Sequence, residues 1–331
     1  MRGLIWVTVV LAGLWGGWWL VGSRGVKAAA EEWFAAQAAR GIEAGYADMT
    51  VAGFPNRFDL TVSEPELGDP ATGLGWRAPF AQVFAMTWKP WHLIAALPGG
   101  QVFRLPGGEV TLDGTRMMGS LLLVPGSDLA LAEAVAEGEA LALAPGLGGM
   151  RGAERVVVSI RADQTREHGY RIGAKLSGLG LDAVWAAGAG LPAEIAEGYL
   201  DATADLSAAI DRHAAETRPA LQQLDLTASR LVWGELNLSA TGQLAADAAG
   251  FAAGQIDIRV ENWRLLPPLL VATGTITADF APTLTRGLEV MAEQGGEPEV
   301  LTLPLVARDG TMSLGPLPLG AAPYWGVRSD G

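Results

Sequence analysis

Nearly perfect alternation of apolar and polar side chains in the two arms of residues 234–263 is the feature that most constrains the fold. Its apolar positions are Leu236, Leu238, Ala240, Ile256, Ile258 and Val260. Polar residues occupy the positions between them, and a stretch rich in alanine and glycine separates the two arms. Because successive side chains of a β-strand point to opposite faces, this pattern predicts a hairpin with one polar and one apolar face. What covers the apolar face is the question that the rest of the chain must answer.

The same period of two recurs through most of the chain. Further strands are predicted at residues 57–63, 109–113, 155–161, 170–177 and 224–233, and a terminal pair around the Asp309–Gly310 turn. Glycine and proline punctuate the junctions. The alanine-rich residues 128–144 favour two low-volume strands over a helix because Gly138 lies in their middle, whereas residues 193–212 leave helix and strand open.

Helix signals beyond the amino terminus are few. A short apolar segment follows Trp263, and residues 281–296 have an early proline, apolar residues at helical spacing and a glycine pair at the end. This is little cover for so many strands. The predicted fold class is therefore mainly β, with a long curved antiparallel sheet as a groove, rolled sheet or sandwich, an N-terminal transmembrane helix and a few short helices.

The amino terminus predicts a membrane anchor. Residues Leu4 to Val21 carry no charge, and at ~1.5 Å per helical residue they extend ~27 Å, close to the thickness of a bilayer's hydrocarbon core. A cleaved signal peptide is the alternative, with Ala28 and Ala30 as the small residues of its cleavage site. The apolar run is longer than is usual for a signal peptide, which favours an uncleaved anchor.

The expected organisation is an anchor at residues 1–25, a membrane-proximal helix at 26–45 and a sheet-rich body at 46–331, with two lobes that could meet near residue 190. Basic residues on the two sides of the anchor nearly balance, so they do not set its orientation. An exported body is expected because no second span returns the chain. This gives a single-pass inner-membrane protein with a periplasmic body.

Composition and motifs argue against several functions. The net charge of −13 disfavours nucleic acid as a partner, and the absence of cysteine excludes thiol chemistry and disulfides. His92, His168 and His213 lie in separate segments without the spacing of a metal site. No nucleophile elbow or complete phosphate-binding loop occurs. We therefore predict no catalytic, cofactor-binding or metal-binding residue, and no enzymatic activity.

Four stretches together resemble an uncharacterised bacterial envelope family, the domain of unknown function 2125. They are VAGFPNRFDLTVSEPEL, MTWKPWHLIAALPGG, the region from LVWGELNLS to ENWRLL, and LTLPLVARDGTMSLGPLPLG. The spacing of Gly242, Gly250 and Gly254 is among its most specific parts. The last third is also similar to the carboxyl-terminal region of AsmA-like proteins. That likeness implies an inner-membrane anchor, a periplasmic curved sheet with an apolar inner face and a role in envelope integrity or phospholipid movement.

The leading functional hypothesis is accordingly an envelope protein that binds or transports lipid. Its candidate partners are the inner membrane, through the N-terminal helix, and phospholipid acyl chains. The candidate groove lining is Phe58, Leu60, Val62, Leu236, Leu238, Ile256, Ile258 and Val260. The alternative is a non-catalytic interaction or scaffold subunit of an envelope complex, and a hydrolase that uses paired carboxylates is less favoured.

Overall fold

A computed structural model describes residues 2–315 and 317–326. The fold is mainly β, with an antiparallel sheet that does not close, one long N-terminal helix and few short helices, as predicted. The chain divides into two compact units, Met1–Pro125 with Ala136–Leu147 and Gly126–Val135 with Gly148–Gly331. Residue 190 lies inside the second unit.

Helix α1 (Arg2–Ala39) joins the predicted anchor and most of the predicted membrane-proximal helix in one continuous element of 38 residues, but Glu43–Gly45, expected in that second helix, form a strand. It ends at Ala39, and Gly41 follows in the turn with a φ of +86°, which suits a residue without a side chain. No residue is buried in the most apolar stretch of this helix. Among the described helices, α1 is the one that is long and apolar enough to cross a membrane. From Trp15 onward the helix contacts the first unit, as shown below.

The first unit contains the short strands. They are β1 (Glu43–Gly45), β2 (Asp48–Ala52), β3 (Arg57–Ser63), β4 (Glu66–Asp69), β5 (Leu74–Arg77), β6 (Phe80–Met86), β7 (Lys89–Leu97), β8 (Gln101–Leu105), β9 (Gly108–Asp113) and β10 (Arg116–Leu123). Strand β11 (Leu131–Leu147) gives its first residues to the second unit and the rest to the first.

Most of these short strands are halves of longer bent strands. Strand β3 pairs with β6, and β4 pairs with β5, with only two residues between the halves on each side. Backbone hydrogen bonds from Glu64 N–H to Pro79 O (3.0 Å) and from Ala78 N–H to Pro65 O (3.2 Å) join the hairpin across the bend. Proline and glycine also lie at the β7–β8 bend (98–100) and the β9–β10 bend (114–115). The first unit is therefore a meander that is creased across its strands.

Helix α1 covers one face of this meander. The core there consists of Met49, Leu60 and Val62, with Val26, Ala30, Phe34, Val51 and Val83 packed against it. Phe58 reaches the same helix, because a β-carbon added at Gly22 would lie 2.4 Å from its Cζ atom. The alternation predicted for residues 57–63 therefore places its apolar side under α1.

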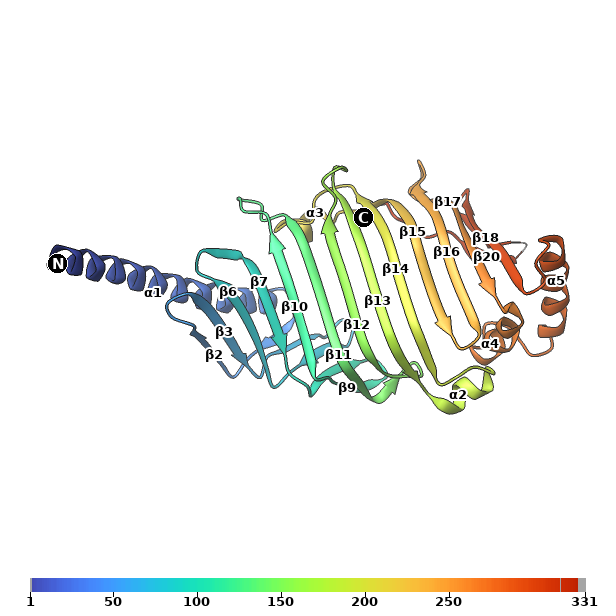
Figure 1. The fold of residues 1–331 in the computed structure, drawn as a ribbon, viewed down its shortest axis with the longest axis horizontal. Coiled ribbons are helices and arrows are strands. Elements are labelled where there is room, and N and C mark those ends of the chain that lie inside the picture. The colour runs from blue at the N-terminus through green and yellow to red at the C-terminus, as the bar shows by residue number, and fades with distance from the viewer. Residues whose placement is uncertain (1, 316, 327–331) are drawn as a thin grey trace. The chain divides into compact units, whose positions relative to one another are not determined.

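The second unit is a simple up-and-down meander (Figure 1). Its strands are β12 (Met150–Ala162), β13 (Gly169–Leu181), β14 (Glu194–Leu206), β15 (Leu221–Trp233), β16 (Leu236–Ala246), β17 (Ala252–Glu261), β18 (Val300–Arg308), β19 (Thr311–Leu314) and β20 (Leu317–Ala321). Each pairs antiparallel with the next. No described pairing joins β12 to β20, so this ladder is open.

The opening hairpin of the sequence forms as predicted, between β16 and β17. Leu238 lies opposite Val260 and Ala240 opposite Ile258, so their apolar side chains share one face. Gly242 and Gly254 lie where the two backbones approach closely. A β-carbon at either residue would meet a carbonyl oxygen of the other strand at 2.3 Å, and their φ values are +149° and +137°. This geometry explains Gly242 and Gly254 of the glycine spacing, whereas a β-carbon on Gly250 would instead meet the Tyr324 ring at 2.9 Å.

Short helices cover the carboxyl-terminal strands of the second unit. They are η1 (Trp263–Leu265), α4 (Leu266–Ala272) and α5 (Ala281–Gln294), the last of which confirms the predicted amphipathic helix. Leu284, Leu288 and Ala292 recur every four residues along α5 and are buried. The remaining helices are α2 (Ala183–Gly188) and α3 (Ala214–Thr217).

The two alanine-rich segments are both extended. Strand β11 runs unbroken through most of residues 128–144, so the preference for strands is confirmed but the division into two strands is wrong. Residues 194–206 form β14, which settles the choice left open there. The small side chains Ala202, Thr203 and Ala204 are all buried within β14, so the sheet and not local propensity decides the conformation.

Candidate functional site

Three of the eight candidate lining residues lie beneath α1. Phe58, Leu60 and Val62 are 5%, 8% and 6% exposed. The ring of Phe58 also stacks on Trp19 of α1, with the ring centroids 6.4 Å apart. The chain's own helix therefore occupies the apolar face at this place.

The other five lie in the second unit, where the chain covers most of their surface. Leu236 and Val260 are 0% and 2% exposed in a core with Trp263, Leu288 and Leu301. Leu238 and Ile258 are partly buried against that core, and Ile256 joins a neighbouring cluster with Leu244 and Ala307. The structure thus separates the eight residues into different cores. The hairpin's apolar face covers protein.

A different part of the same face is left open, over strands β12 to β14. We call it the open strip. It consists of Val156, Val158, Ile160, Ile172, Ala174, Leu176 and Leu200. Strand register places them together, because Ile160 pairs with Ile172, Val158 with Ala174 and Val156 with Leu176, and Ala174 pairs in turn with Leu200.

The open strip belongs to none of the core clusters in the described part of the chain. Val158 is 44% exposed, and the other six side chains are partly exposed. Every member is apolar, although a half-exposed position on an antiparallel sheet usually carries a polar residue. Contiguous exposed apolar residues of this kind mark binding surfaces.

Two elements border the strip at its ends. At one end the loop of residues 207–213 lies over Tyr170, which is 3% exposed and whose hydroxyl accepts a hydrogen bond from Ile210 N–H at 2.7 Å. At the other end α2 follows β13, and Trp185 stacks on Trp233 with the ring centroids 5.9 Å apart. The sheet is therefore covered at both ends of the strip, and the strip between them is part of no core cluster.

Asp182 fixes helix α2 at this border. Its carboxylate accepts hydrogen bonds from Val184 N–H and Trp185 N–H, both at 3.1 Å, and so caps the helix. The guanidinium of Arg151 also donates to it. These bonds, with Arg151 contributing most, hold the pKa of Asp182 below the 3.8 of a free aspartate.

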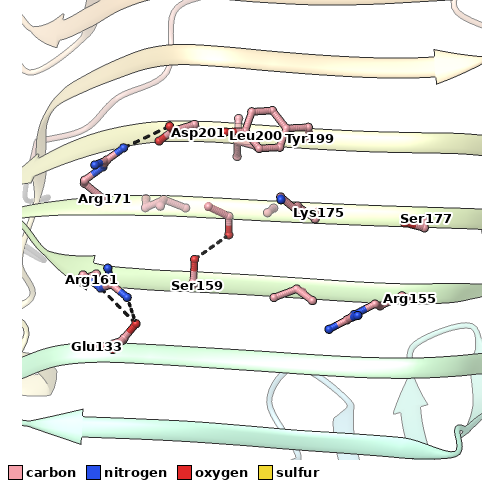
Figure 2. A pocket seen from close by; sticks show the side chains of 14 residues that line it. Glu133, Arg155, Ser159, Arg161, Arg171, Lys175, Ser177, Tyr199, Leu200 and Asp201 are labelled. Atoms are coloured by element: carbon pink, nitrogen blue, oxygen red, sulfur yellow. Dashed lines mark hydrogen bonds and ion pairs between the residues drawn. The ribbon is translucent and has the colours of Figure 1, made fainter.

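The opposite face of the same strands carries a polar hollow of about 740 Å³ (Figure 2). Basic residues dominate its wall, with Arg155, Arg161, Arg171 and Lys175 against Glu133 and Asp201. Because side chains alternate along β12 and β13, the charged side chains of the hollow and the apolar side chains of the open strip point to different sides of the sheet, although Ile172, Ala174 and Leu200 of the strip also border the hollow. One ligand lying on the strip does not reach the hollow through the sheet.

The charges of the hollow are largely engaged with each other. Arg161 forms an ion pair with Glu133, and Arg171 donates to Asp201 at 3.3 Å. The ammonium of Lys175 lies 5.9 Å from the centroid of the Tyr199 ring. Pairs this exposed contribute little to stability. Ser159 donates only to the backbone oxygen of Gly173, and no histidine lines the hollow, so no nucleophile and base meet there.

The histidines are placed singly. His92 contacts Ser120 at 3.0 Å within the first unit, His168 lies near Glu167 and His213 near Glu216. No cluster of three or more metal-binding side chains occurs within residues 2–315 and 317–326.

Comparison with known proteins gives the family and no activity. No curated protein and no solved structure matches the chain. The likeness to AsmA-like proteins therefore stays a prediction. The family described as "Uncharacterized protein conserved in bacteria (DUF2125)" matches residues 19–323, which include the second half of α1, all the strands and the open strip. The chain is a member of this bacterial family.

Proposed function

We propose that this protein is a single-pass envelope protein, with its body in the periplasm, that holds phospholipid acyl chains on the open strip. The proposal assigns it no catalytic step. It replaces the eight residues expected from the sequence by the seven of the strip, because most of those eight are buried under the chain's own helices.

The observation that carries the proposal is the exposure of the strip. Seven apolar side chains lie on one face without a charged neighbour in their rows, and Val158 exposes 44% of its surface. A free acyl chain is the simplest ligand for such a surface, because its binding requires apolar contact area and no hydrogen bond. Each buried methylene group contributes about 0.8 kcal/mol, so ten of them give a gross ~8 kcal/mol before the cost of ordering the lipid.

A charge placed on the strip tests this directly, and the chain supplies its own control. Val157 and Val158 are neighbours in β12 that point to opposite faces. The full-length chain, Val158→Asp and Val157→Asp would each be purified in mild detergent and examined by native mass spectrometry and lipid extraction. We expect phospholipid with the wild-type protein and with Val157→Asp, and its loss from Val158→Asp.

Circular dichroism would confirm that both variants keep their strands. A photo-crosslinking amino acid at position 158 would then identify what touches the strip in cells. A phospholipid adduct supports the proposal. A protein adduct at 158, with no lipid on the purified chain, would instead make the strip a docking face and favour the scaffold alternative.

The periplasmic location has a separate test. A phosphatase that is active only after export would be fused to the carboxyl terminus, beside a fluorescent protein that matures only in the cytoplasm. We expect phosphatase activity and no fluorescence, because the proposal places the body in the periplasm and α1, the one described span, leaves the body on a single side. Fluorescence alone would place the body in the cytoplasm.

A further inference from the structure

The turn between β2 and β3 is attached to the apolar part of α1. The indole N–H of Trp15 donates to Pro55 O at 3.0 Å, and that of Trp19 donates to Arg57 O at 2.7 Å. Phe54 packs edge-on against Trp19, with the ring centroids 5.4 Å apart. A β-carbon on Gly16 would lie 3.7 Å from the ring of Phe54, so the helix approaches the turn closely at this residue.

These contacts fix the depth of the turn. The apolar run of α1 extends to Val21, and Trp15 and Trp19 lie six and two residues before that end. At ~1.5 Å per residue, the turn lies beside the last ~3–9 Å of the segment that would span the membrane. A turn held at that level lies in the boundary between headgroups and acyl chains whenever α1 spans.

A second hairpin tip lies beside the first. Thr87, between β6 and β7, is 3% exposed and donates from its N–H to Asn56 O at 3.0 Å. Its neighbours Met86 and Trp88 are 42% and 56% exposed, and Phe54 on the first tip is 62% exposed. Three large apolar side chains thus project from two joined tips, although such tips normally carry small polar residues.

From this arrangement we propose that the two tips, residues 53–56 and 86–88, insert into the membrane beside α1. The partner is the lipid bilayer interface itself. Trp and Phe at this depth match the aromatic belts of membrane proteins, and a basic residue, Arg57 or Lys89, follows each tip in the sequence. The inference rests on α1 spanning the membrane and is independent of whether the open strip binds lipid.

Because the chain contains no cysteine, a thiol-reactive label attaches at a single introduced cysteine. Single cysteines would be introduced as Phe54→Cys, Trp88→Cys and Ala71→Cys, and labelled with an environment-sensitive fluorophore in the full-length chain. Ala71 is exposed in the β4–β5 turn, at the far end of the bent strands that start at the first tip, and serves as the matched control. The proteins would be reconstituted into phosphatidylethanolamine–phosphatidylglycerol vesicles.

We expect labels at positions 54 and 88 to emit at shorter wavelength, to be quenched by shallow nitroxide lipids and to lose several-fold in quenching by aqueous iodide. The label at 71 should remain fully open to iodide. Equal iodide quenching at all three positions would overturn the proposal. Repeating the measurement with a small nitroxide and power-saturation spectroscopy excludes insertion driven by the fluorophore, and a signal lost in that repeat also counts against it.

Discussion

At the scale of single residues, glycine decides how closely the strands β16 and β17 approach. Gly254 has a φ of +137°, and a β-carbon there would lie 2.3 Å from Gln243 O. The obstacle is backbone, so no side-chain rotation relieves it. The spacing of Gly242 and Gly254 thus records the close approach of two neighbouring strands.

We predict that Gly254→Ala destabilises the second unit by roughly 1–3 kcal/mol, through backbone strain and the overpacked hairpin. Chemical denaturation followed by circular dichroism measures this. Gly188→Ala in α2 is the control, because an added β-carbon there meets nothing within 4 Å and alanine favours helix. Equal stability of the two variants would contradict the prediction.

Asp182 gives a pH-dependent prediction. Its pKa is lower in the folded chain than the ordinary 3.8, so its contribution to stability is present above pH 3.8 and is lost as the pH falls through the folded pKa. Asp182→Asn should therefore melt at a lower temperature than wild type near neutral pH. The two melting temperatures should converge as the pH falls below 3.8. A difference that is constant over this range would show that the carboxylate charge plays no part.

At the scale of elements, helices decide which apolar faces stay closed. Helix α5 buries Leu284, Leu288 and Ala292 against the sheet, while Val290 on its other side is 53% exposed. We predict that Leu288→Ala costs about 2–5 kcal/mol in the unfolding free energy of the second unit, and that Val290→Ala costs much less. Urea titration of both variants would check this. A larger loss from Val290→Ala would indicate that the exposed side of α5 is covered.

The elements also show what the sequence could and could not reveal. Alternation of apolar and polar residues predicted β3, β16 and β17, because a strand with one buried face carries an apolar side chain at every second position. Apolar residues at helical spacing predicted α5. The crease was missed. Pro65 reads as the end of a strand, yet the chain resumes pairing at Glu66 after a two-residue corner. A proline has no backbone N–H to donate to a neighbouring strand, and the sequence alone does not show whether the strand ends or bends at that residue.

The open strip was missed for a different reason. Val156, Val157 and Val158 are apolar in succession, so this run hides the face to which each belongs. The alternation of apolar and polar residues also identifies an apolar face but does not show what covers that face. Leu236 and Val158 look alike in sequence, but the first is 0% and the second 44% exposed. That distinction depends on where distant helices pack, which no local pattern encodes.

At the scale of the whole molecule, α1 combines two tasks in one helix. Its uncharged first half suits the membrane, and its second half forms the core of the first unit with Leu60 and Val62. We predict that the full chain stays in the membrane fraction through an alkaline carbonate wash. A variant without residues 2–14 should be released, because the remaining apolar stretch is too short to span. Retention of that variant would mean that other contacts suffice for anchoring.

The up-and-down order of β12 to β20 has a last consequence. Since each of these strands pairs along its length with its sequence neighbours, apart from the bonds of residues 250–252 to 323–325, most contacts form between segments that are close along the chain, and assembly can proceed strand by strand as the polypeptide is delivered. In this strand order, an inserted hairpin would lengthen the sheet without changing how the other strands pair. A gene that encodes such a sheet can therefore change its span by duplication of two strands at a time.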